Sequence, residues 1–205
     1  SPSKIKLEIE FFEKGKITRS ENFFMKSPSN DYLDIDINNL VKKNKLKNIS
    51  AFQVRTKAVN GKIPTRVNHQ LVYGSNTKDA LLGSINSSLT NNEIMIPKGK
   101  KGFAWGQILI GKEYNSYVGF CFKTANGKKD NLNLKFYDEN GCFKEINKIL
   151  DPKESCIIDS KKILITKDKI KFIWFEARST NPTITAHAVH LHRKSGNASA
   201  EHSFH

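Results

Sequence analysis

The feature that most constrains the fold is a repeated alternation of apolar and polar side chains. Three segments, 5–11, 33–37 and 132–136, carry an apolar residue at every second position, with charged residues or Asn between them. Successive side chains of a β-strand point to opposite faces, so this pattern predicts strands with one buried and one solvated face. Helical periodicity is weak, and the best helix candidate, 77–85, is short.

Turn signals divide the rest of the chain into short extended segments. Further strand candidates are 49–57, 67–73, 102–110, 116–123, 169–178 and 183–193. Three Asn-Gly pairs, Asn60-Gly61, Asn126-Gly127 and Asn140-Gly141, are typical of tight β-hairpins. Many short strands at close spacing predict an all-β protein, an antiparallel β-sandwich of the jelly-roll type.

A repeated set of residues suggests an internal duplication. Four residues recur later in the chain at one constant spacing: Asp36, Phe52, Arg55 and His69 as Asp159, Phe175, Arg178 and His192. On this hypothesis two pseudo-symmetric halves, 1–74 and 130–205, pack into one body and 75–129 connects them. The alternative is that β-proteins share generic strand and turn patterns, since chance gives roughly two such identities over this length.

Composition is that of a folded and strongly basic protein. The 205 residues include 38% hydrophobic residues and 13 Phe, enough for a real core. The net charge of +14 favours anionic partners such as nucleic acid or acidic polysaccharide. Most of this charge comes from Lys, a weaker bidentate phosphate reader than Arg, and no nucleic-acid-binding motif accompanies it. The charge therefore allows nucleic acid as a partner, but no sequence motif supports it.

No segment approaches the roughly 18 apolar residues that span a bilayer, so we expect a soluble protein. The polar start of the chain fits a cytoplasmic protein and also a secreted one after removal of its signal. The three cysteines, Cys121, Cys142 and Cys156, are odd in number and lack CxxC spacing. This pattern argues against a disulfide framework or a cysteine-only zinc site.

Histidines near the C-terminus suggest a metal site. In a regular strand His190 and His192 share one face and His187 lies on the other. Imidazole suits divalent transition metals, and His202 or Glu201 is the candidate third ligand from the next strand. The alternative is that these histidines bind no metal and are solvent-facing or hydrogen-bonded side chains of a strand.

Two Arg–His pairs form a candidate ligand site. Arg55 with His69, and Arg178 with His192, are the two copies within the proposed repeat. A guanidinium beside an imidazole can grip a carboxylate, a phosphate or sugar hydroxyls. The simpler alternative is an internal polar network with the repeated aspartates.

Trp105 is the remaining candidate ligand residue. It lies between Gly102 and Gly106, which would expose its ring for stacking on a sugar or a base. The alternative, more common for such a ring, is that Trp105 caps the core. Trp174, within the apolar run 172–175, is expected in the core.

Three hypotheses of function follow. The chain lacks the G-x-S-x-G, Walker A, dinucleotide-binding and H-E-x-x-H signatures of common enzymes. The leading hypothesis is a non-catalytic module that binds an anionic or hydroxyl-rich ligand. A saccharide is the favoured ligand class. The alternatives are a metal-dependent enzyme that uses the C-terminal histidines, and a structural subunit such as a capsid or surface-lattice protein, which would form homo-oligomers.

Overall fold

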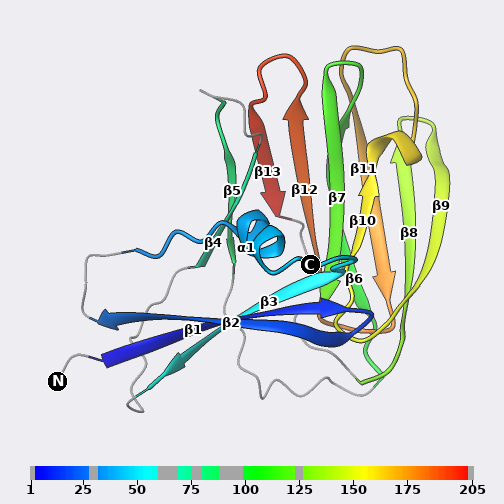
Figure 1. Cartoon of the computed structure of the whole chain (residues 1–205). Coiled ribbons are helices and arrows are strands. Elements are labelled where there is room, and N and C mark those ends of the chain that lie inside the picture. The colour runs from blue at the N-terminus through cyan, green and yellow to red at the C-terminus, as the bar shows by residue number, and fades with distance from the viewer. Residues whose placement is uncertain are drawn as a thin grey trace. The chain divides into compact units, whose positions relative to one another are not determined.

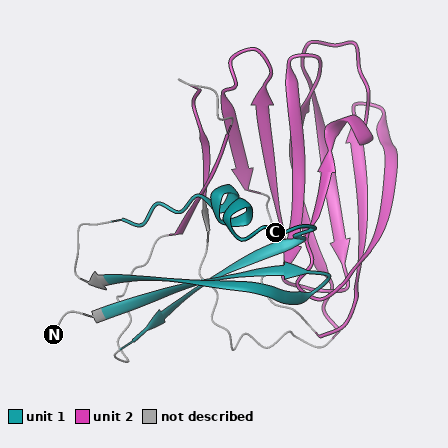
Figure 2. Cartoon of the chain, viewed as in Figure 1, with its two compact units in different colours: residues 1–67 teal, residues 68–205 magenta. Residues whose placement is uncertain are grey.

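The computed structural model describes residues 3–27, 32–59, 69–74, 80–87, 99–122 and 127–202. The chain divides into two compact units, residues 1–67 and 68–205 (Figure 2). All strand pairings within the described residues are antiparallel. The prediction of an all-β, antiparallel protein is confirmed.

The first unit contains a three-stranded sheet in the order β2-β1-β3. Its strands are β1 (Ser3–Glu13), β2 (Lys16–Ser27) and β3 (Ala51–Ala58). Lys14 and Gly15 both have positive φ and join β1 to β2, as tight hairpin turns require. Ile5, Ile9 and Phe11 are buried, as the alternation over 5–11 predicts, but Glu10 between them is buried as well.

A short helix, α1 (Ile37–Lys43), replaces the strand predicted over 33–37. Asp36 is the N-cap residue: its Oδ1 accepts the Asn39 N–H at 2.9 Å, and its backbone carbonyl accepts the first helical bond from Leu40. No residue of α1 is buried. The strand prediction was wrong because five alternating residues are too few to outweigh a good helix cap.

The second unit contains a β-sandwich of two four-stranded sheets, here called the β6 sheet and the β7 sheet (Figure 1). The β6 sheet has, in spatial order, β6 (Gly102–Ile110), β11 (Lys171–Ser179), β8 (Asp130–Asp138) and β9 (Gly141–Leu150). The β7 sheet has, in spatial order, β10 (Cys156–Asp159), β7 (Tyr114–Phe122), β12 (Ile184–His192) and β13 (Ala198–His202).

The connections of the sandwich are those of a jelly roll. From β6 to β13 the chain crosses between the sheets at every connection except two hairpins, β8–β9 and β12–β13. The pairs β6 with β11 and β7 with β10 are nested around the β8–β9 hairpin. The sandwich prediction is confirmed, and so is the hairpin at Asn140-Gly141, where Gly141 has a φ of 107°.

Two further sequence predictions fail in the described residues. The strands on either side of Asn126-Gly127, β7 and β8, belong to different sheets, so this pair does not close a hairpin. The helix predicted over 77–85 is also wrong, because residues 80–82 are not helical and Gly83 begins a strand. Asn60-Gly61 and residues 75–79 lie outside the described residues.

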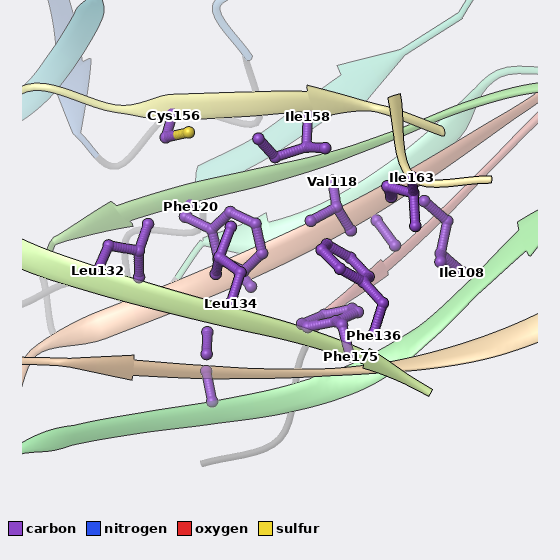
Figure 3. Close-up of a cluster of buried hydrophobic side chains, with 14 of the residues drawn as sticks. Ile108, Val118, Phe120, Leu132, Leu134, Phe136, Cys156, Ile158, Ile163 and Phe175 are labelled. Carbon is purple, nitrogen blue, oxygen red and sulfur yellow. The ribbon is translucent and has the colours of Figure 1, made fainter. Parts of the chain in front are cut away.

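The core of the sandwich is one cluster of apolar side chains from both sheets (Figure 3). Phe120 of β7 and Phe175 of β11 meet edge to face, with ring centroids 5.6 Å apart. Burial alternates strictly along β6 and β8, so every second side chain of these strands points inward. The same alternation decides which side chains point to the outer side of the β6 sheet.

A two-stranded sheet, β4 (His69–Tyr73) with β5 (Gly83–Ser87), lies beside β13. The Ala198 N–H donates to the Leu81 carbonyl at 2.7 Å. At Gly83 an added Cβ would lie 2.8 Å from the Ala200 nitrogen, so glycine permits this close approach.

The two aspartates of the proposed repeat share one local role. Asp36 caps α1, and Asp159 caps the 3-10 helix η1 (Ser160–Lys162) by accepting the Lys161 N–H at 2.9 Å. Asx capping of this kind is common wherever a helix begins. The internal duplication, and the division at 74 and 129 based on it, stay predictions.

We expect Phe120→Ala to lower the free energy of unfolding by about 3–5 kcal/mol, because the fully buried ring leaves a cavity in the core. Phe172→Ala is the matched control, since Phe172 is 61% exposed and its loss should cost at most about 1 kcal/mol. Urea denaturation followed by circular dichroism measures both values. Equal losses in the two variants would contradict the assigned core.

Candidate functional site

Large aromatic side chains gather on the outer side of the β6 sheet. They occupy the positions that alternate with the core residues. This surface, called the aromatic face, comprises Phe103 and Trp105 on β6, Phe172 and Trp174 on β11, and Tyr137 on β8. Trp105 is 36% exposed and Trp174 is 44% exposed. Such a concentration of exposed rings in a highly charged protein indicates a contact surface.

The two tryptophans lie side by side rather than stacked. In the strand register Trp174 is opposite Gln107, and Trp105 is opposite Glu176, so the rings are diagonal neighbours. Their centroids are 6.0 Å apart and their planes differ by 31°. Diagonal side chains on a sheet are within reach of each other when they are aromatic. The pair presents a broad apolar platform.

Polar groups border this platform. The Tyr137 hydroxyl donates to Glu176 Oε2 at 3.3 Å, and Arg178 Nη2 lies 3.5 Å from the same oxygen. The Arg178 guanidinium also lies over the Phe103 ring, 5.0 Å from its centroid. A carboxylate, a guanidinium and a phenol are therefore held next to the aromatic rings.

Two surface hollows adjoin the platform. The larger, about 420 Å³, is lined by Trp105, Trp174 and Gln107, with Glu201 and His202 of β13 among its other walls. The smaller, about 360 Å³, is lined by Phe103, Trp105, Tyr137, Trp174, Phe175 and Glu176. Both volumes fall within the range of small-ligand sites, and both hollows share the two tryptophans.

The glycines beside Trp105 have packing roles. A Cβ on Gly102 would lie 2.1 Å from the Asn181 carbonyl oxygen, and one on Gly106 would lie 2.9 Å from the Phe175 ring. Gly106 thus makes room for Phe175 to pack under β6. Side-chain alternation, rather than the neighbouring glycines, turns Trp105 outward.

The structure brings together two of the predicted ligand residues, Trp105 and Arg178, on the aromatic face. Trp174 was expected in the core, and this was wrong. Phe175 takes the inward position, so Trp174 must point outward. The run 172–175 is apolar throughout and hides the alternation. The charged residues Glu176 and Arg178 mark the outward positions and could have revealed it.

The other predicted ligand residues lie elsewhere. His192 ends β12 in the β7 sheet, with its ring against Tyr114 and its Nδ1 2.9 Å from Ser195 Oγ. It makes no contact with Arg178 among the described residues. Arg55 belongs to the first unit, where its Nε lies 3.1 Å from Glu10 Oε2. His69 is on β4 in the second unit, and burial lowers the pKa of its imidazole.

The three histidines of the predicted metal site are not brought together. His190 points into the sandwich, only 4% exposed, and its Nδ1 lies 3.3 Å from Ser116 Oγ. The register places His202 opposite His187, with ring centroids 5.0 Å apart, and this pair is on the other face of the sheet. Within the described ranges no three His, Cys, Asp or Glu side chains group as metal ligands.

No protein family matches the chain, and neither a curated protein nor a solved structure is significantly similar to it. In the part of the chain that the structure describes, no helix has both the length and the apolar character to cross a bilayer. Function must therefore be inferred from the chemistry of the site.

We expect the free energy of unfolding to fall as the pH drops below about 6.5, partly because of His190. Burial lowers the pKa of His190, against a smaller opposing effect of Glu201. In this pH range the unfolded chain therefore takes up a proton that the folded chain does not. In denaturation experiments between about pH 5 and pH 8, the free energy of unfolding of His190→Gln should depend less steeply on pH than that of the wild type. An equal slope in the wild type and in His190→Gln would refute the assignment.

We expect Glu176→Gln to lower the pKa of Tyr137. Burial is the largest cause that raises this pKa. The Glu176 charge raises it further because it disfavours the phenolate. Ultraviolet titration of phenolate absorbance measures the change, and the Tyr137→Phe variant identifies which transition belongs to Tyr137. An unchanged Tyr137 transition in Glu176→Gln would show that the two side chains are not in contact.

Proposed function

We propose that the protein is a non-catalytic saccharide-binding module and that the aromatic face holds the sugar. The observation that carries this proposal is the exposed Trp105–Trp174 pair, with centroids 6.0 Å apart. The C–H bonds on one side of a pyranose ring carry a small positive charge, and an indole presents its negative face to them. Two adjacent indoles offer such a surface to one or two sugar rings.

The border of the platform supplies what the sugar hydroxyls require. Glu176 can accept hydrogen bonds, Arg178 donates from a planar fork, and the Tyr137 hydroxyl does both. Glu176 is itself held by Tyr137 and Arg178, so its carboxylate is oriented before a ligand arrives. Apolar walls with a few placed polar groups are typical of small-ligand sites.

The local charge favours a hydroxyl-rich ligand over a densely anionic one. Around the platform Arg178 and Lys135 accompany Glu176, so the signs are mixed even though the whole chain carries +14. A polyanion would meet the Glu176 carboxylate at the centre of the site. The lysine-rich composition is therefore not the source of specificity in this proposal.

Both tryptophans of the chain belong to the aromatic face, so intrinsic fluorescence reports only on this site. We expect a glycan array to identify binders, and a fluorescence titration to give saturable binding. Trp105→Ala and Trp174→Ala should each weaken binding roughly tenfold or more, by analogy with the loss of a base-stacking aromatic. Calorimetry replaces fluorescence for these two variants.

Ile157→Ala is the matched control, because Ile157 is 69% exposed but lies on β10 of the other sheet. Its binding should equal that of the wild type. Identical array profiles for the wild type and both tryptophan variants would remove the aromatic face from the function. Tighter, strongly salt-dependent binding of single-stranded DNA would instead identify a nucleic-acid site.

A further inference from the structure

We propose that the binding site continues from the aromatic face across β8 to the edge strand β9, so that the ligand is an oligosaccharide chain rather than a single sugar. This inference rests on the proposed function. The spatial order of the strands is β6-β11-β8-β9 (Figure 1). The tryptophans are on the first two of these strands, Trp105 on β6 and Trp174 on β11. The outward side chains of the last two strands then decide how far a ligand can extend.

The strand register aligns these side chains in rows perpendicular to the strands. One row runs from Trp105 through Glu176 and Lys135 to Glu145. The next row runs from Phe103 through Arg178 and Asn133 to Asn147. Each row begins at a ring on β6 and ends at a polar side chain on β9. An elongated ligand lying along a row would meet stacking surfaces first and hydrogen-bonding groups afterwards.

The polar end of this path is ordered. Asn133 Nδ2 donates to Glu145 Oε1 at 2.5 Å and to Asn147 Oδ1 at 2.8 Å. These two bonds use both N–H groups of the Asn133 amide and fix its orientation. Lys135 lies between Glu176 and Glu145 in the register and forms no ion pair within the described residues. Its ammonium group can therefore donate to a ligand hydroxyl.

The dimensions suit a chain of several sugars. Neighbouring strands are about 4.8 Å apart, so the path from β6 to β9 is roughly 14 Å long. A single pyranose on the tryptophan pair would leave the β9 end of this path in contact with water. Strand β9 is the last strand of its sheet, so a longer chain could leave the protein at this edge. The mixture of amide, carboxylate and ammonium groups matches the donors and acceptors of sugar hydroxyls.

The first test is chain length. Cello-oligosaccharides, a neutral series, and hyaluronan oligosaccharides, an acidic series, are titrated from the shortest to the longest by tryptophan fluorescence. We expect affinity to rise with chain length in the series that binds, and to level off once the chain spans the four strands. Binding that does not depend on length would overturn the extended path but leave the proposed function intact. No fluorescence response to either series would count against the proposed function as well as the path.

The second test uses variants at the polar end. Glu145→Ala and Asn147→Ala should each weaken the longest binding oligosaccharide about five- to tenfold, the value of a lost hydrogen bond. Both should leave the shortest binding member unaffected. Lys148→Ala is the matched control, since Lys148 is an exposed β9 residue that alternates with Asn147 and points to the other side. Length dependence that survives both substitutions would show that the ligand takes another route.

Cys142 gives an independent readout without mutation. It is the exposed one of the three cysteines, and the register places it opposite Tyr137, on β9. Cys121 is only partly exposed, and Cys156 is buried, which raises the pKa of its thiol, so maleimide labelling should favour Cys142. We expect a long oligosaccharide to slow this labelling and a short one to leave it unchanged, as measured by mass spectrometry. Equal labelling rates with both would contradict an approach of the ligand to β9.

Discussion

The contact between Phe120 and Phe175 across the sandwich is the interaction on which the aromatic face depends. Side chains of a strand alternate, so an inward Phe175 sends Trp174 and Glu176 outward together. Pairing with β11 then places Trp105 beside them. A shift of one residue in this register would bury the charged side chains and expose the core, which makes the arrangement strongly specified.

The exposed tryptophans belong to a group of aromatic side chains gathered on two neighbouring strands. A chain with a net charge of +14 has many polar residues with which to cover a sheet, yet four large aromatic side chains on β6 and β11 face outward. Glu176, Arg178 and Tyr137 hold one another at their border. Apolar area combined with oriented polar groups is the usual composition of a specific binding site. The candidate site is thus defined by its chemistry, independently of the sequence of any relative.

Alternation predicted much of the fold, since β6 and β8 follow their apolar periodicity closely and β1 follows it at Ile5, Ile9 and Phe11. It failed where the pattern was short, at α1, or continuous, at 172–175. The sequence suggested Trp105 and Arg178 as site residues. It did not reveal that Trp174 lies beside them, because that placement depends on long-range strand pairing. The metal hypothesis placed His190 and His192 on one face correctly, but it could not foresee that this face is the interior or that His202 pairs with His187.

The nested jelly-roll connections determine at which stage of folding the site can form. Trp105 and Trp174 stand on adjacent strands, but the chain builds β7, β8, β9 and β10 between them. Closing such long loops is entropically costly, and folds dominated by distant pairings form slowly. A nascent or truncated chain that ends before β11 lacks half of the platform. The platform is therefore a property of the finished sandwich, and melting of the sandwich must abolish it.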